Sequence, residues 1–288
     1  VVNDRSWDES LDVLIAFEQQ YENLRIVDIP DVGKDEYAKK MAITLGIKAA
    51  QFDRLLFTDA DCRPANQHWL TEMNEGFQDN KMLVLGAGPY LRRKGLLNRL
   101  IRFDAIYIAM QYLSFGKAKI PYMGVGRNLG YTKELYDSIR GFKSHYHIPS
   151  GDDDLFVNEA GNRRNTSVIF NKNAVTFSKP KTTYKEWWRQ KKRHFTTGNR
   201  YKKYQLILLT LFPLSLVLFY TSFIILISLK IFPFYILGML CVKILIQILI
   251  FIRPFKIMGS RDLILLAPFL ELIFLVLNPI LISKSKHL

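Results

Sequence analysis

Cysteine is scarce throughout this sequence, and acidic residues are scarce in its last third. The 288 residues include two cysteines, Cys62 and Cys241, one in each half. They indicate neither a disulfide framework nor a cysteine-rich zinc site. From residue 201 to the end, the acidic residues are Asp262 and Glu271, set among Leu, Ile, Phe and Val. This uneven composition predicts a soluble domain followed by a membrane domain.

Two common nucleotide-binding fingerprints and a leader sequence are also missing. No G-K-S/T occurs, which excludes a P-loop, and the glycines at 124, 126 and 130 do not match G-x-G-x-x-G. No secretory signal peptide opens the chain. It begins without Met, apparently inside an apolar run. We therefore expect a first strand and its loop to precede Val1 in a longer protein.

Positive charge is abundant. The formal net charge is +14, and the densest basic run, Lys181–Lys203, has nine Lys or Arg residues and one Glu. Because this run directly precedes a long apolar segment, it indicates a juxtamembrane position and favours membrane lipid over nucleic acid as a partner. Trp187 and Trp188 lie within the run. They predict an interfacial helix over residues 184–204 that lies flat on the membrane.

Three apolar segments form the predicted membrane domain, residues 205–288. Each is long enough to cross a hydrocarbon core of about 30 Å; they are residues 206–229, 231–252 and 263–282. We expect Lys243 and Glu271 to pair within the membrane or to lie near its surface. The basic flanks predict a multi-pass protein of the cell's inner (plasma) membrane, with residues 1–183 in the cytoplasm.

Residues 1–183 have the composition of a globular α/β domain. Short apolar segments predict buried strands, and longer segments predict helices between them. A helix at 96–113 has an apolar face that packs in the core or touches lipid, and the core is favoured. The strands are expected at 24–27, 55–58 and 82–85, and the helices between them at 36–50 and 69–77. This order predicts a Rossmann-like, mostly parallel sheet with flanking helices. In such sheets ligands bind beyond the carboxyl ends of the strands.

Two carboxylates, Asp59 and Asp61, directly follow the strand predicted at 55–58. Two residues apart at a strand end, they project to the same side and can share one cation. Hard oxygen ligands favour Mg²⁺ or Mn²⁺. A D-x-D segment is common by chance, and an Asp turn that closes the strand is the alternative interpretation. A glycine-rich turn, 124–128, follows another apolar stretch, and its Arg127 is a candidate for binding phosphate.

Five segments, in order, resemble the family 2 glycosyltransferases, which are inverting enzymes with the GT-A fold. They are VVNDRSWDES (1–10), FTDADC (57–62), GVGRNLGYTKELYDSIRGF (124–142), SGDDDLF (150–156) and RQKKRH (189–194). The resemblance runs from Val1 to about Gly198. The apolar segments after it suit membrane-bound members of the cellulose-synthase-like and bacterial polysaccharide type. It implies a nucleotide-sugar donor, with UDP as the expected carrier.

The resemblance also assigns roles to single residues. It implies that Asp4 contacts the nucleotide base, that Asp61 with Asp59 holds the metal beside the donor, and that Gln190 and Arg193 lie near the diphosphate or the acceptor entrance. The last motif departs from the family pattern Q-x-x-R-W, because His194 replaces the Trp that stacks on the acceptor sugar. Phe195 or Trp188 is a candidate for supplying a ring instead.

The aspartate run 152–154 contains the general base that the resemblance implies. Placing Asp154 and Leu155 on the family pattern makes Asp152 the base, with Gly151 where the family usually has Glu and Asp154 as a supporting acid. A shift by one residue makes Asp153 the base, and both stay open. The base takes the proton of the attacking acceptor hydroxyl, and the configuration inverts. A hydrated acidic loop is the alternative interpretation of the run.

These observations predict a membrane-anchored inverting glycosyltransferase. It would transfer a sugar from a nucleotide-sugar to a lipid-linked (polyprenyl) or polysaccharide glycan. Two alternatives remain open: a processive polysaccharide synthase, and a non-catalytic membrane scaffold that keeps the glycosyltransferase fold. The set of candidate site residues argues against the scaffold, which has no need of them.

Overall fold

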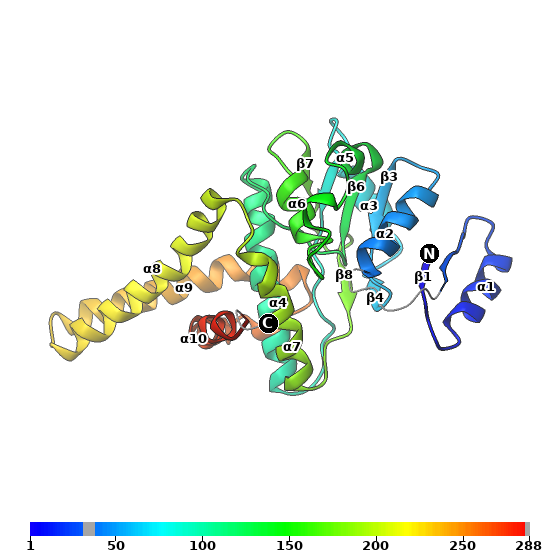
Figure 1. Cartoon of the computed structure of the whole chain (residues 1–288). Coiled ribbons are helices and arrows are strands. Elements are labelled where there is room, and N and C mark those ends of the chain that lie inside the picture. Colours follow the sequence, from blue (N-terminus) through cyan, green and yellow to red (C-terminus); the bar gives the residue numbers. More distant parts are fainter. Residues whose placement is uncertain (31–37, 286–288) are drawn as a thin grey trace.

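Four short strands form a mixed sheet at the centre of the α/β part of the molecule (Figure 1). The computed structural model describes residues 1–30 and 38–285. Across the sheet the strands are β3 (Arg54–Phe57), β6 (Leu129–Thr132), β5 (Leu83–Leu85) and β7 (Thr166–Val168). β6 is antiparallel to β3 and β5, while β5 and β7 are parallel. The α/β fold is confirmed, but a mostly parallel sheet is wrong for the described residues.

The direction of β6 follows from where the chain enters it. Leu129, its first residue, pairs with Phe57 at the end of β3 and with Leu85 at the end of β5. The chain therefore enters β6 at the carboxyl edge of both neighbours and runs back along them. The glycine-rich loop that precedes β6 consequently lies at the same edge as the residues that follow β3.

Two smaller sheets complete the strands of the described residues. β1 (Val2–Asp4) and β2 (Val27–Ile29) are parallel, and β4 (Cys62–Pro64) and β8 (Thr176–Ser178) are antiparallel. α1 (Ser10–Gln20) connects β1 to β2, and α2 (Ala38–Ala49) packs against both strands. The helix predicted at 36–50 is α2, although residues 36 and 37 lie outside the described part of the chain.

The longest helix of the α/β part, α4 (Leu96–Lys117), is a core helix, the alternative that its sequence favoured over contact with lipid. Phe103, Ile106 and Tyr112 on its buried face are at most 1% exposed. Shorter helical segments surround the sheet: α3 (Trp69–Glu75), α5 (Lys133–Ser138), the 3₁₀ turn η1 (Lys143–His145) and α6 (Asp154–Ala160). These helices hold the sheet in place, and the candidate site lies at one edge of it.

A helical hairpin extends away from the α/β part (Figure 1). It consists of α8 (Lys203–Ser228) and α9 (Pro233–Ile257), which pack against each other. Both are long and apolar enough to cross a membrane, and most of their apolar side chains face outward. The tight turn predicted at Lys230 is present, with positive φ values at Lys230 and Phe232.

The third predicted span has a different structure. A 3₁₀ turn, η2 (Arg261–Leu263), precedes α10 (Ala267–Ser285), whose apolar part, Ala267–Ile282, is shorter than the two candidate spans. α10 packs against α7 (Tyr184–Gly198). The described residues therefore contain two candidate spans rather than the three expected. A run of apolar residues alone does not distinguish a spanning helix from one that packs on a neighbour.

Candidate active site

The sheet topology brings three separate segments to one edge. Asp59 and Asp61 follow β3, the glycine-rich loop 124–128 precedes β6, and the aspartate run 152–154 begins α6. Asn128 holds the loop in place, because its side-chain amide donates to the carbonyl oxygens of Ala87 (2.8 Å) and Ala174 (2.7 Å). Asn128 is fully buried.

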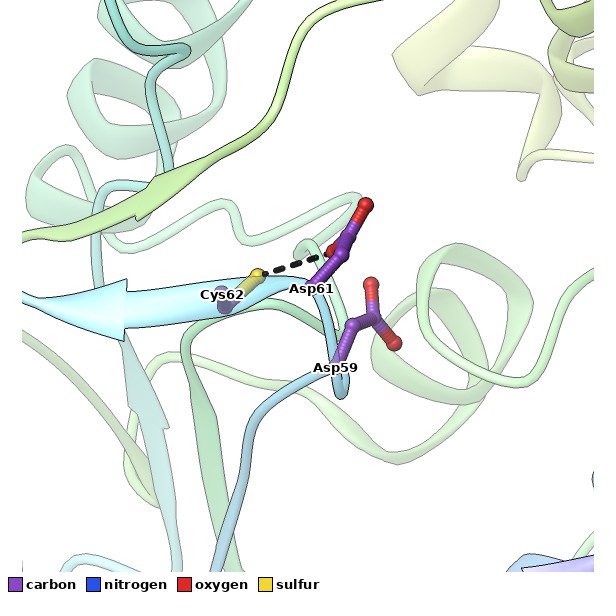
Figure 2. A group of neighbouring side chains, drawn as sticks. All are labelled: Asp59, Asp61 and Cys62. Carbon is purple, nitrogen blue, oxygen red and sulfur yellow. Dashed lines mark hydrogen bonds between the residues drawn. The ribbon is translucent and has the colours of Figure 1, made fainter. Parts of the chain in front are cut away.

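Asp59, Asp61 and Cys62 form a cluster of possible metal ligands. One ligand atom from each lies within 4.8 Å of the others, and Figure 2 shows both carboxylates on the same side of the turn. The Cys62 thiol lies 3.5 Å from Asp61 Oδ1 and 3.0 Å from Ser178 Oγ. Burial raises the pKa of this thiol, which keeps it protonated. The two carboxylates are therefore the ligands that suit Mg²⁺ or Mn²⁺.

Lys39, in the first turn of α2, bridges the carboxylates of two segments. Its Nζ lies 2.8 Å from Asp152 Oδ2 and 3.4 Å from Asp59 Oδ1. Burial alone would lower the pKa of Lys39, but Asp152, Asp153 and Asp59 together raise it above its ordinary value. Sequence reasoning missed this residue, since its significance depends on a contact between distant segments.

Asp153 anchors the start of α6. One carboxylate oxygen accepts from the Gly126 N–H at 2.8 Å, and the other accepts from the Asp154 N–H at 2.8 Å, as a helix N-cap does. Burial, followed by the charges of Asp152 and Asp154, raises the pKa of Asp153 to about 7. A carboxyl group with such a pKa can exchange a proton near neutral pH.

Gly151 turns the backbone into the aspartate run. Its φ of +95° lies in the region that favours glycine. A Cβ at this position would lie 2.6 Å from Leu155 Cδ1. These two constraints give a physical reason for the glycine that replaces the family's usual Glu here.

Asp154 lies between the start of α6 and the end of α7. Its buried carboxylate accepts hydrogen bonds from the Tyr201 hydroxyl (2.9 Å), from the Thr197 hydroxyl and from the Leu155 N–H (2.8 Å). Thr197 is near the end of α7, and Tyr201 lies between α7 and α8. The contacts of Asp154 therefore join α6 to the segment between α7 and the hairpin.

Arg127 and Gln190 meet at Tyr90, another residue that sequence reasoning missed. The Arg127 guanidinium lies 4.5 Å from the centre of the Tyr90 ring, and Gln190 Nε2 donates to the Tyr90 hydroxyl at 3.1 Å. Arg127 also lies 3.4 Å from Ser178 Oγ, the hydroxyl that contacts Cys62. A continuous chain of contacts thus connects Gln190 of α7 to the carboxylate cluster.

The remaining candidates, Asp4 and Arg193, lie apart from this network. Asp4 ends β1 and pairs with its neighbour Arg5, at 2.8 Å. Arg193 is exposed on α7, and its carbonyl accepts from the Thr196 hydroxyl. For the described residues, neither side chain has a direct contact with Asp59, Asp61 or the aspartate run among the observed hydrogen bonds and ion pairs.

Comparison with known proteins assigns this arrangement to a family. The profile of glycosyl transferase family group 2 matches residues 55–253, more than half of the chain. The chain belongs to glycosyl transferase family group 2. The GT-A-like α/β fold, with its mixed sheet and flanking helices, is the fold that the resemblance implied. The matched range includes the carboxylate cluster, the glycine-rich loop, the aspartate run and α7.

One curated protein and two solved structures are similar to this chain. The probable glycosyltransferase YdaM of Bacillus subtilis (strain 168) is 25% identical over 217 residues, covering 70% of this chain and 47% of that protein. The chain thus spans about half the length of this curated relative. The mannosyltransferase PcManGT from Pyrobaculum calidifontis, in complex with GDP-Man and Mn²⁺, has a TM-score of 0.49 and 18% identity, covering 70% of this chain and 55% of that chain. A mycobacterial protein has a TM-score of 0.40 and 15% identity, covering 67% of this chain and 63% of that chain.

Proposed function

We propose that this chain is the catalytic and membrane-anchoring part of an inverting glycosyltransferase. It transfers a sugar from a nucleotide-sugar, with UDP as the expected carrier, to a lipid-linked or polysaccharide glycan. One observation carries the proposal. In a chain of this family, the carboxylates Asp59 and Asp61 lie at the same sheet edge as Asp152, and Lys39 contacts both Asp59 and Asp152.

The reaction is a single displacement. The acceptor hydroxyl gives its proton to a carboxylate of the aspartate run, with Asp152 as the first candidate and Asp153 as the second. The acceptor oxygen forms a bond to the anomeric carbon as the bond to the diphosphate breaks, and the diphosphate leaves with that electron pair. A divalent cation held by Asp61 and Asp59 would supply positive charge for the departing diphosphate.

Arg127 and Gln190 support the donor side of the reaction. The guanidinium of Arg127, on the loop before β6, is held over the ring of Tyr90. Its fixed charge suits a phosphate. Gln190 sets the position of Tyr90 from α7. In this proposal Asp4 contacts the nucleotide base, and Arg193 lies near the donor diphosphate or at the acceptor entrance.

The two candidate spans suit a membrane anchor. Residues 184–204 form the boundary between a cytoplasmic domain at 1–183 and the membrane domain, as the basic residues there favour. In this arrangement the catalytic domain faces the cytoplasm of a cell whose inner membrane holds α8 and α9. A glycan carried by a polyprenyl lipid, or growing at the cell surface, reaches the site from that membrane.

The first test measures donor binding by the full chain in detergent. Nucleotide-sugars are screened by thermal shift with and without Mn²⁺. We expect one donor to stabilise the wild-type protein in a metal-dependent way, and Asp61→Ala to lose that effect. No stabilisation by any donor, in protein shown to be folded, would favour the non-catalytic scaffold.

The second test identifies the base. Asp152→Asn should keep metal-dependent donor binding while transfer falls by about 10²–10⁴-fold, the usual contribution of a general base. Asp153→Asn is the matched comparison, because it makes the same change of nearly equal size at the adjacent position. If Asp152→Asn transfers sugar at the wild-type rate and Asp153→Asn does not, Asp153 is the base.

A further inference from the structure

Lys39 is the cation that the carboxylates share in this structure. Its ammonium lies between Asp152 (2.8 Å) and Asp59 (3.4 Å). An ideal Cβ on Gly126 would lie 3.7 Å from Lys39 Nζ and 3.5 Å from Asp153 Oδ2. The ammonium therefore lies next to the glycine-rich loop, at the point where the three site segments converge.

The position of Lys39 on its helix runs against the usual preference. It is the second residue of α2, in the first turn. The partial positive charge of a helix N-terminus favours acidic residues there and disfavours basic ones. The side chain as a whole is 54% exposed, while its ammonium meets the buried carboxylate of Asp152. The carboxylates that face Lys39 from two other segments offset this unfavourable placement.

The geometry points to Lys39 as a tethered counter-ion that a divalent metal displaces from Asp59. This inference rests on the proposed metal site. Asp59 belongs to the ligand cluster with Asp61 and also contacts the Lys39 ammonium. An ammonium and a divalent cation that share one carboxylate repel each other and compete for it. Lys39 thus offsets part of the charge of Asp59, and a metal bound by Asp59 weakens the hold of Lys39 on that side.

Lys39 therefore couples the metal site to the candidate base. Its other partner, Asp152, is 9% exposed, and the 2.8 Å contact with Lys39 directs its carboxylate toward the ammonium. While Lys39 is shared, Asp152 and Asp59 are tied to one cation. When the contact with Asp59 is lost, the Lys39 side chain can either keep its contact with Asp152 or leave it. Metal binding in this way changes the surroundings of Asp152, the first candidate for the base.

Mn²⁺ binding to the full-length chain without donor tests this inference directly. The free Mn²⁺ signal in electron paramagnetic resonance gives the dissociation constant. We expect the Mn²⁺ dissociation constant of Lys39→Met to be lower than that of wild type by at least about fivefold, because one nearby positive charge has been removed. Lys39→Arg keeps the charge and should bind like wild type. Lys48→Met, at an exposed position of the same helix, is the matched control and should not change the affinity.

A second measurement uses the wild-type protein and needs no variant at Lys39. Acetylation of amines by a short activated ester, resolved by mass spectrometry, reports the accessibility of each lysine. Mn²⁺ should increase labelling of Lys39 severalfold and leave Lys48 unchanged. Equal labelling of Lys39 with and without bound Mn²⁺, or an unchanged Mn²⁺ affinity in Lys39→Met, overturns the inference.

Asp61→Ala separates this inference from the proposed function. If Asp61→Ala still binds Mn²⁺ as wild type does, the metal-site assignment itself is wrong. If Asp61→Ala loses Mn²⁺ while Lys39→Met binds it like wild type, the metal site stands and the role given to Lys39 is wrong.

Discussion

The three consecutive aspartates of the site have three different environments. Asp152 contacts Lys39, Asp153 caps α6 and accepts from Gly126, and Asp154 is buried beneath Thr197 and Tyr201. Adjacent residues point in different directions where a loop becomes a helix, so each meets a different part of the fold. A run that looks uniform in the sequence therefore supplies a charge pair, a cap and a buried anchor.

The raised pKa of Asp153 predicts how stability depends on pH. In the folded state its pKa is about 7, against an ordinary value of 3.8. Between these values the folded state binds more protons than the unfolded state, so stability falls as pH rises through this window. Above about pH 7 the stability that protonated Asp153 contributes is lost completely. Asp153→Asn stays neutral and can still accept from Gly126, so it should avoid this loss.

Melting temperatures of both proteins across this pH range check the prediction. Asp153→Asn should gain stability over wild type between about pH 4 and 7, and keep the full gain above that range. Asp137→Asn, at an exposed position on α5, serves as the control. A difference between Asp153→Asn and wild type that does not vary with pH would contradict the raised pKa.

At the scale of elements, α7 connects the site to the helices around it. Gln190 reaches Tyr90 on the site side, while Lys191, its neighbour, is buried and contacts Asp104 of α4 at 2.7 and 2.9 Å. Trp187 packs on Phe274 of α10 with ring centres 6.3 Å apart. α7 therefore presents different side chains to the site, to α4 and to α10, and α4 sets its position.

Breaking the Lys191–Asp104 pair should move Gln190 as well as destabilise the fold. Removing one partner of a buried ion pair costs about 3–5 kcal/mol because the other charge stays buried and unpaired. We expect Lys191→Met to lower the free energy of unfolding by an amount of this order and to raise the KM for the donor. Lys185→Met, at an exposed position of the same helix, should change neither. A loss of stability with an unchanged donor KM would show that the pair does not position Gln190.

Local patterns predicted most of these elements, and long-range contacts account for the rest. The sequence favoured a core position for α4 over contact with lipid, and long apolar runs predicted the α8–α9 hairpin. The direction of β6 could not be predicted, because it depends on which sheet edge the chain enters. α10 resembled a span because packing against α7 and insertion into lipid both require apolar residues.

The same distinction applies to the site. Asp59 and Asp61 follow a strand, so their sequence position alone predicted the sheet edge. Lys39 and Tyr90 become significant only when α2 and the segment after β5 reach that edge, and neither has a signature in its own neighbourhood. The sequence showed that Gly151 departs from the family pattern. Its reason, a positive φ and the nearby Leu155 side chain, is visible only in the structure.

At the scale of the whole molecule, ion pairs connect the hairpin to the α/β part. Arg102 of α4 is 1% exposed, and its guanidinium donates to both carboxylate oxygens of Asp262 at 2.6 and 3.0 Å. It also donates to Ser260 Oγ at 3.1 Å. The turn between α9 and α10 is thus fixed to the core helix of the α/β part.

A second polar cluster lies among the apolar helices themselves. Lys243 of α9 contacts Glu271 of α10, one of the two arrangements expected from the sequence, and also donates to Tyr220 Oη of α8 (2.9 Å) and to Gln247 Oε1 (2.7 Å). Glu271 is 4% exposed. A charged group in apolar surroundings is costly unless it is paired. The cluster therefore favours one arrangement of the three helices over others.

A double-mutant cycle tests whether this pair joins α10 to the hairpin. Lys243→Met and Glu271→Gln each leave a polar or charged partner without its counterpart, so each single variant should lower the melting temperature in detergent. The double variant removes both charges and should recover most of the loss, with a coupling free energy of about 0.5–3 kcal/mol. Lys230→Met, in the exposed turn between α8 and α9, is the control. Additive losses in the double variant would mean that the two charges do not hold α10 against α9, and that its contact with α7 suffices to place it.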